Sequence, residues 1–267
     1  MTSGLKRHTY NFDGLFTLEM ANNHQGSVDH GLSIIREFGK VVREEGIRAA
    51  VKFQFRDLQT FIHPDFLNST ANKHIPRFLS TKLSRQEFEV LLAEVRKEGM
   101  VTMATPFDEA SVDTCADLDV EVVKVASCSA KDWPLLEKIA SVRKPVIVST
   151  GGLTIKEIDN LVSFFEHRYV DFALMHCVAI YPTPDAKLEL NQVELMRRRY
   201  PQLTIGFSTH EEPDNTTAIQ VAYAKGARIF ERHVGIATPT VKLNAYSSTP
   251  EQIRAWLIAY KKSVVTC

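Results

Sequence analysis

An eightfold alternation of apolar runs with amphipathic stretches is the feature of this 267-residue chain that most constrains its fold. The apolar runs, which suit buried strands, are Leu15–Met20, Ala49–Phe53, Val101–Ala104, Val120–Ala126, Pro145–Ser149, Val170–Cys177, Leu203–Phe207 and Ala227–Glu231. Each run precedes a stretch with helical spacing, and eight such units in about 250 residues are typical of a (β/α)8 barrel. An open, doubly wound sheet is the alternative, but the chain has no obvious second half. We therefore predict a single α/β domain over residues 1–267 with the (β/α)8 TIM barrel fold.

Several of the expected helices carry start signals. Ser84–Glu87 and Thr154–Glu157 have the spacing of capping boxes. A threonine followed by a proline at the first helical position predicts a last helix over Pro250–Val264. The stretch Asp57–Ser84 is the one long irregular segment, and loops of this length in compact domains are often functional lids.

Charge and composition exclude several classes of function. The 32 basic and 32 acidic residues balance, so no electrostatic footprint for nucleic acid or an anionic membrane is visible. No apolar run approaches the roughly 20 residues of a membrane span, and the first residues lack the apolar core of a signal peptide. The four cysteines show no paired spacing, as expected of reduced thiols. These observations predict a cytoplasmic protein.

Two apolar runs near the carboxyl end of the chain each finish in a histidine, His210 and His233. The segment between them, Pro213–Gly226, has helical spacing, which predicts strand, helix and strand. Both histidines should then lie at the carboxyl ends of neighbouring parallel strands, where barrel enzymes keep their chemistry. Two imidazoles there can share one divalent ion and leave other positions open. The alternative is a pair of structural histidines.

Lysines and hydroxyls at other strand ends point to a bound anion. Lys52 and Lys124 lie inside runs that should be buried, where an ammonium group is costly unless an anion pairs with it. The alternative is a lysine stem packed on apolar surface with its head in water. The hydroxyls expected on the same face are those of Thr105, Ser127, Ser149 and Ser208. Two ammonium groups and a ring of hydroxyls suit a small phosphorylated carboxylate.

Three further residues have two interpretations each. The Ser149–Gly152 turn offers backbone N–H groups ahead of a helix, which is a weak anion-binding signal by itself. Glu19 ends the first strand and either pairs with a lysine or takes part in proton transfer or substrate binding. Cys177 follows His176 without the pattern of a nucleophile and its base, which favours a core residue.

Together, these residues resemble the sialic acid synthase (N-acetylneuraminate synthase) family and related nonulosonate synthases. The matching stretches, in order, are Glu19-Met-Ala-Asn-Asn-His-Gln-Gly26, Val51-Lys-Phe-Gln54, Ala104-Thr-Pro-Phe107, Val123-Lys-Val-Ala-Ser127, Val148-Ser-Thr-Gly151, His176-Cys177 with Tyr181-Pro-Thr-Pro184, Gly206-Phe-Ser-Thr-His210 and Glu231-Arg-His233. They extend from about residue 15 to residue 235. Jointly they are specific, although few would be specific alone.

The resemblance implies a barrel that condenses phosphoenolpyruvate with an aldose, using manganese or magnesium. It implies that His210 and His233 bind the metal. By position, the residues implied to hold phosphoenolpyruvate are Lys52, Thr105, Lys124, Ser127, Ser149 and Ser208. Glu19, Gln54 and Tyr181 would face the acceptor sugar. The implied chemistry is attack of the enol carbon on the aldehyde, addition of water, and loss of phosphate by C–O cleavage.

The chain also departs from the family pattern. Cys128-Ser129 stands where Gly-Glu is usual, Ala179 replaces a polar residue, and Thr209 replaces an aspartate. The family's antifreeze-like domain, which places an arginine in the partner's site and implies a homodimer, has no counterpart in these 267 residues. We therefore expect either an acceptor other than N-acetylmannosamine or one domain of a longer protein.

Two other classes of function remain open from the sequence. A Schiff-base aldolase would use Lys52 or Lys124 as its nucleophile, would be trapped by borohydride, and would not respond to chelators. A non-catalytic barrel would only bind a ligand or partner, although it has no need of two buried ammonium groups.

Overall fold

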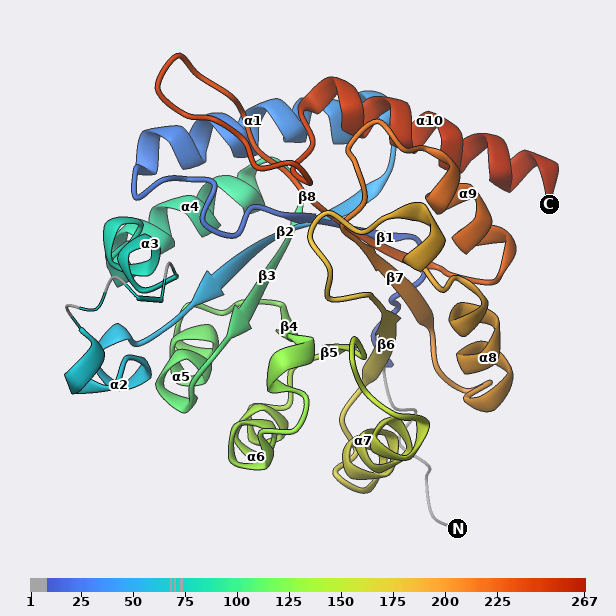
Figure 1. The fold of residues 1–267 in the computed structure, drawn as a ribbon, viewed down its shortest axis with the longest axis horizontal. Helices are drawn as coiled ribbons and strands as arrows, with labels where there is room; N and C mark the ends of the chain where they lie inside the picture. Colours follow the sequence, from blue (N-terminus) through green and yellow to red (C-terminus); the bar gives the residue numbers. More distant parts are fainter. Residues whose placement is uncertain (1–8, 68, 70, 73) are drawn as a thin grey trace, which may run out of the picture.

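Eight parallel strands close into a barrel in which each strand pairs with its sequence neighbours and β1 pairs with β8 (Figure 1). The strands are β1 (Leu15–Glu19), β2 (Arg48–Phe55), β3 (Val101–Pro106), β4 (Val122–Val125), β5 (Val146–Ser149), β6 (Phe172–His176), β7 (Ile205–Thr209) and β8 (Ile229–His233). This computed structural model describes residues 9–267 except 68, 70 and 73. The predicted (β/α)8 barrel is confirmed.

Helices surround the barrel. The ones that follow the strands are α1 (Val28–Glu45), α4 (Arg85–Lys97), α5 (Glu109–Asp117), α6 (Trp133–Ser141), α7 (Ile155–His167), α8 (Asn191–Arg199), α9 (Thr217–Ala224) and α10 (Pro250–Thr266). The capping boxes predicted at the starts of α4 and α7 are present, and a third begins α10. Within the described residues, no helix is both long enough and apolar enough to cross a membrane.

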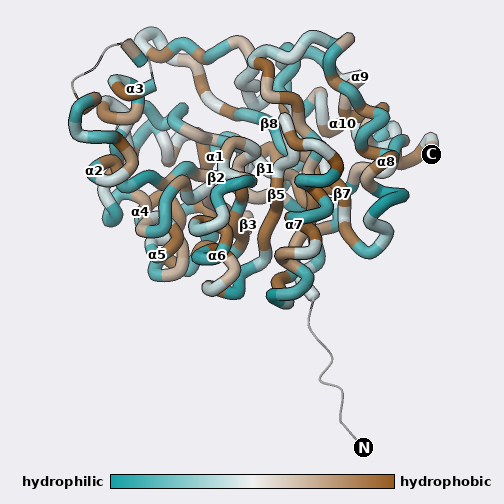
Figure 2. Tube along the Cα trace, turned by 60° about the horizontal axis from the view of Figure 1, so that its bottom comes forward, coloured by the Kyte–Doolittle hydropathy of each residue, from teal (hydrophilic) through white to brown (hydrophobic). Residues whose placement is uncertain are grey.

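Two apolar cores lie on the two sides of the barrel wall. Outward-facing strand residues such as Phe16 and Phe230 pack against the helices, and Trp256 of α10 meets both rings edge-on. Inward-facing residues such as Leu15, Met103 and Ile147 form a smaller core inside the barrel. Figure 2 shows the central strands as largely apolar segments among more polar helices. The inner core fills the amino-terminal half of the barrel, so the polar inward positions belong to its carboxyl half.

Some element boundaries differ from the prediction. The Asp57–Ser84 stretch is not irregular throughout, because it contains α2 (Leu58–Phe61), a 3-10 turn η1 (Pro64–Phe66) and α3 (His74–Ser80). Figure 1 places α2 and α3 at the outer edge of the barrel rather than across its centre. The helix expected over Pro213–Gly226 is shorter, since α9 begins only at Thr217, after a turn in which Asn215 accepts the helix's first backbone N–H groups. Two more 3-10 turns, η2 (Ser127–Ser129) and η3 (Asp185–Lys187), follow β4 and β6.

Candidate active site

Alternation along the strands decides which side chains enter the barrel. Successive residues of a strand point to opposite faces, so every second residue faces inward. In β1 the inward series ends at Glu19, in β2 it includes Lys52 and Gln54, and in β8 it ends with Glu231 and His233. The same register brings Glu19 opposite both Lys52 and His233. The sequence therefore assembles one polar layer from distant parts of the chain at the carboxyl end of the barrel.

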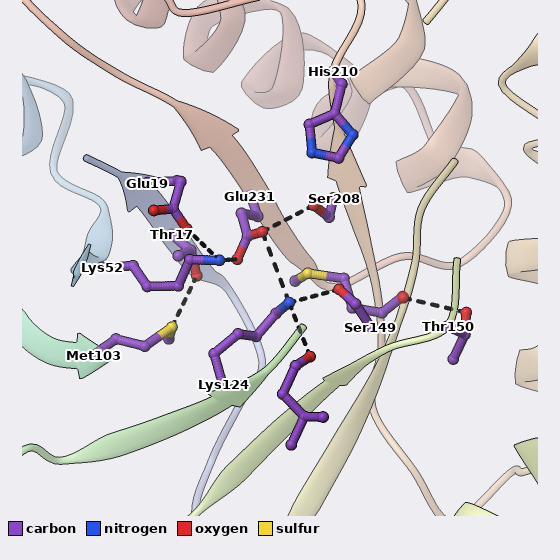
Figure 3. A network of polar contacts seen from close by, with 12 residues as sticks. Thr17, Glu19, Lys52, Met103, Lys124, Ser149, Thr150, Ser208, His210 and Glu231 are labelled. Carbon is purple, nitrogen blue, oxygen red and sulfur yellow. Dashed lines mark hydrogen bonds and ion pairs between the residues drawn. The ribbon is translucent and has the colours of Figure 1, made fainter. Parts of the chain in front are cut away.

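Lys52 and Lys124 lie within a buried network of charges (Figure 3). The Nζ atom of Lys52 lies 2.5 Å from an oxygen of Glu19 and 2.6 Å from an oxygen of Glu231. Lys124 donates to Ser149 Oγ at 2.5 Å and lies 3.8 Å from Glu231. These contacts exclude the alternative in which the lysine heads reach water. Both ammonium groups are enclosed and face carboxylates.

Glu231 occupies the centre of this network. Ser208 donates a hydrogen bond to Glu231 Oε1 at 2.9 Å, while Lys52 contacts the other oxygen. Burial alone would raise the pKa of Glu231, but the charges of Lys124 and Lys52 hold that pKa well below its usual value. Burial lowers the pKa of Lys52 to about 7, although the Glu231 carboxylate opposes this shift. Burial and the Glu231 carboxylate therefore act in opposite directions on the pKa of Lys52.

His210 and His233 face each other above this network. Their ring centroids are 5.5 Å apart, and the rings are inclined by 50°. Burial lowers the pKa of His210 to about 4 and lowers that of His233 well below its usual value, so both imidazoles are neutral at pH 7. The Nδ1–H group of His210 donates to the Val178 carbonyl oxygen at 3.2 Å, which leaves its Nε2 lone pair free to bind a metal.

The histidine pair fits a divalent ion with an incomplete protein shell. Metal–nitrogen bonds of about 2.0–2.1 Å bring the centroids of two ligating imidazoles to roughly 5 Å, close to the observed separation. Among the described residues, no group of three His, Cys, Asp or Glu side chains could hold a metal ion. An ion bound here would take its remaining ligands from water or substrate, as in catalytic rather than structural sites.

An aromatic pair borders the histidines. The Tyr181 ring centroid lies 4.3 Å from that of His210, and the Tyr246 centroid lies 5.0 Å from that of His233. The two tyrosine rings are 5.3 Å apart. Tyr181 comes from the loop after β6, and Tyr246 comes from the loop between β8 and α10. Together they line the side of the site that is open to solvent, because about half of Tyr181 is exposed.

The remaining predicted residues lie at the ends of β2, β3 and β4. Gln54 donates to Glu19 Oε1 at 3.5 Å, and Thr105 is its register partner on β3. Ser127 begins η2 and approaches the turn after β5, where a Cβ added to Gly151 would lie 3.3 Å from Ser127 Oγ. Thr105, Ser127, Ser149 and Ser208 thus lie at or directly after the carboxyl ends of β3, β4, β5 and β7.

Several conspicuous residues lie outside the site. His176 is on the outward-facing side of β6, where its ring stacks with Phe207 and its Nε2 atom bonds to the Leu188 carbonyl oxygen. Cys177, in contrast, is buried as predicted but adjoins the site, close enough to Lys52 and Tyr181 to interact with both electrostatically. Thr209 pairs in register with Arg232, whose guanidinium lies over the Trp256 ring of α10. Thr209 therefore faces the helical layer rather than the interior of the barrel.

The sequence does not identify two residues of the site, Glu231 and Tyr246, as functional. Glu231 was recognised as a strand-end residue but given no role, although its spacing of two from His233 placed it on the same face. Tyr246 lies in a loop without periodicity, so no pattern in the sequence could place it beside His233.

One protein-family model and several curated proteins match this chain. The NeuB family model matches residues 43–262. The chain is 31% identical over 226 residues to N-acetylneuraminate-9-phosphate synthase of Drosophila melanogaster, covering 80% of this chain and 58% of that protein. It is 29% identical over 224 residues to spore coat polysaccharide biosynthesis protein SpsE of Bacillus subtilis, covering 82% and 58% respectively. The chain thus spans about three fifths of the length of these curated relatives.

A solved structure extends the similarity. A Chromobacterium violaceum protein, described as a spore coat polysaccharide biosynthesis protein E, superimposes with a TM-score of 0.93 and 44% identity, over 95% of this chain and 75% of that one. The family model covers most of the barrel, including both histidines and both buried lysines. The chain belongs to the NeuB family.

Proposed function

We propose that this chain catalyses the divalent-metal-dependent condensation of phosphoenolpyruvate with an aldose, giving a 3-deoxy-2-ulosonic acid and phosphate. The observation that carries the proposal is the buried Lys52–Glu231–Lys124 network directly below two neutral imidazoles. Family membership and the relatives named as synthases support it. In this proposal the site lies at the carboxyl end of the barrel, where TIM-barrel enzymes carry out their reactions.

Phosphoenolpyruvate carries a phosphate and a carboxylate, which match the two buried cations. In the proposal Lys52 and Lys124 bind these groups as point charges, and hydroxyls donate to the remaining oxygens. The proposed hydroxyl donors are Thr105, Ser127, Ser149 and Ser208. Because Glu231 already contacts both lysines, it would hold them in position before the substrate arrives.

The acceptor would lie above, against Glu19, Gln54 and Tyr181. His210 and His233 would hold manganese or magnesium, which would polarise the acceptor aldehyde as a Lewis acid. The new C–C bond joins C3 of phosphoenolpyruvate to the aldehyde carbon, and the aldehyde oxygen gains a proton. Glu19 and Lys52, 2.5 Å apart, form the proton-transfer pair nearest to that position. Water then adds to C2, and phosphate leaves with the bridging oxygen.

We propose that the acceptor is not simply N-acetylmannosamine. Ser129 and Ala179 occupy positions at which the resemblance implies side chains that bind the sugar. Neither residue can make the hydrogen bonds of a carboxylate or of a larger polar group. Each buried hydroxyl left without a partner costs about 1–3 kcal/mol of binding free energy. The proposal also places the protein in the cytoplasm, consistent with its free thiols, and includes a homodimer as an expectation from the family resemblance.

A Schiff-base aldolase is the second candidate because the lowered pKa of Lys52, about 7, is a property of lysine nucleophiles. Contact of Lys52 with two carboxylates argues against it, because both contacts favour the ammonium form. Borohydride with a carbonyl substrate separates the two functions. A trapped adduct on Lys52 would favour the aldolase.

The direct test measures phosphate release from phosphoenolpyruvate across a panel of aldoses with manganese, magnesium or a chelator. We expect release that requires both an aldose and a divalent ion. His210→Ala and His233→Ala should each abolish it, whereas His167→Ala, at an exposed site on α7, should not. Full metal-dependent activity in both site variants would contradict the assignment of the histidines.

A further inference from the structure

Arg56 follows Phe55, the last residue of β2, and its side chain turns back toward the inward-facing Gln54 of that strand. One guanidinium nitrogen of Arg56 donates to Gln54 Oε1 at 2.9 Å, and Gln54 in turn donates to Glu19. Arg56 therefore stands at the outer end of a polar chain that begins at the buried lysines.

An aromatic cage holds the Arg56 guanidinium in place. Its central carbon lies 3.9 Å from the Phe107 ring centroid, 4.2 Å from that of Phe78 and 5.7 Å from that of Phe61. Such contacts attract the cation and fix its plane, but they provide no hydrogen-bond acceptor. The Nε atom of Arg56 is buried without a hydrogen-bond partner. The cage therefore orients this cation and leaves part of its donor fork unused.

No carboxylate in the described part of the chain forms an ion pair with Arg56. Asp108 is close enough to interact electrostatically, but its two oxygens accept the backbone N–H groups of Asp57 and Ser111 at 2.8 and 2.7 Å. Arg232, a buried arginine outside the site, differs in having Glu211 3.4 Å away. Burial without a counter-ion lowers the pKa of Arg56 to about 10. A largely buried cation without an anion is costly, which makes Arg56 a prepared anion-binding group.

The surroundings of Arg56 belong to the acceptor side of the site. Cys128 of η2 interacts electrostatically with both Arg56 and Tyr181, so it lies near both residues. An anion held by Arg56 would lie beyond Gln54, on the side away from the phosphoenolpyruvate-binding lysines.

We propose that Arg56 is a specificity residue for an acceptor aldose that carries an anionic group, phosphate or carboxylate, at the end remote from its aldehyde. The identification of the anion as an acceptor substituent rests on the proposed function, whereas the anion-binding role of Arg56 rests on its own contacts. The planar fork of arginine suits bidentate binding of either anion.

Calorimetry with ligands that cannot react tests the anion site apart from turnover. The full chain, with phosphoenolpyruvate and manganese present, is titrated with sorbitol, sorbitol 6-phosphate and gluconate. We expect at least one anionic ligand to bind about 10- to 100-fold more tightly than sorbitol, and the preferred one identifies phosphate or carboxylate. Arg56→Gln should remove this preference, and Arg56→Lys should retain part of it as a point charge.

Arg168→Gln is the matched control, because Arg168 also stacks on a phenylalanine ring, that of Phe164, but directly follows the last residue of α7, away from the site. It should keep the preference. Equal binding of the three ligands by the wild type, or an undiminished preference in a folded Arg56→Gln variant, would overturn the proposal. If anions bind through Arg56 but only neutral aldoses support phosphate release, the assignment of the anion to the acceptor is overturned. If anions bind through Arg56 but no aldose of any kind supports release, the anion site stands and the proposed function fails.

Discussion

At Lys52, burial and two carboxylates act in opposite directions on the same ammonium group. Glu19 and Glu231 lie within 2.6 Å of its Nζ atom, yet burial lowers its pKa to about 7. In the proposed function the charged form of Lys52 binds phosphoenolpyruvate, and this form loses its proton as pH rises through 7. The pH dependence of substrate capture should therefore report this residue.

We predict that kcat/KM for phosphoenolpyruvate falls as pH rises from 7 to 8.5, with the decline centred near the pKa of Lys52 in the free protein. The loss should reach about tenfold, because a charge-assisted contact is worth roughly 1.5–3 kcal/mol. Lys52→Arg keeps its charge over this range, so its profile should be flatter even if its activity is lower. A flat wild-type profile, with the protein folded throughout, would contradict this role of Lys52.

Single residues also show how far the sequence predicts the site. Lys52 and Lys124 were identifiable because an ammonium group inside an apolar run requires a buried partner. Their partner, Glu231, is harder to assign from the sequence, because a carboxylate at a strand end can equally form a surface ion pair or contact solvent. Arg56 and Tyr246 depend on contacts with loops that are distant in sequence, and local patterns carry no information about such contacts.

The turn between β5 and α7 is an element whose shape bears directly on the site. A Cβ at Gly151 would lie 2.7 Å from Cys177 Sγ and 3.3 Å from Ser127 Oγ. Gly151 therefore lets the turn approach Cys177 and Ser127 closely, without a Cβ that would displace either side chain. The sequence indicated only a weak anion-binding turn, because close packing between elements cannot be read from one segment.

We predict that Gly151→Ala raises KM for phosphoenolpyruvate about tenfold or more, while the protein stays folded, because overpacking typically costs about 1–3 kcal/mol and here displaces Ser127. Adding Cys177→Ala removes the closest contact and should restore part of the loss. Steady-state kinetics of the single and double variants measures both effects. An unchanged KM in Gly151→Ala would show that the turn does not position Ser127.

Helices and strands differ in how well the sequence predicts their limits. The starts of α4, α7 and α10 follow from local capping residues, and the structure confirms them. β2, β3, β7 and β8 extend past the apolar runs, and each extension includes one polar residue that points into the barrel: Gln54, Thr105, Ser208 and His233. Apolar runs therefore underestimate the length of the strands that end in polar site residues.

The closed barrel is held together by strand pairing and apolar packing, and the imidazole rings of His210 and His233 belong to neither apolar core. β1 and β8 pair along five residues, and the outer and inner cores consist of apolar side chains on both sides of the wall. A metal ion that binds only the folded chain, at free concentration c, would stabilise it by RT ln(1 + c/Kd), which is small for an ion held weakly by two protein ligands. The fold and the proposed metal chemistry should therefore be separable.

We predict that a chelator abolishes phosphate release but leaves the far-UV circular dichroism unchanged and lowers Tm by at most a few °C. Restoring manganese should restore activity. Unfolding of the barrel on chelation would instead indicate a structural metal and contradict an open, two-histidine site.

The central claim is that one site joins phosphoenolpyruvate to an aldose. The most direct measurement supplies phosphoenolpyruvate labelled with 18O at its bridging oxygen, together with manganese and the best acceptor from the aldose panel, and follows both products by mass spectrometry. We predict one phosphate per phosphoenolpyruvate consumed, with the label in the phosphate, and a product whose mass equals the aldose plus pyruvic acid. Phosphate release without an aldose, or label that remains with pyruvate, would contradict the proposed function.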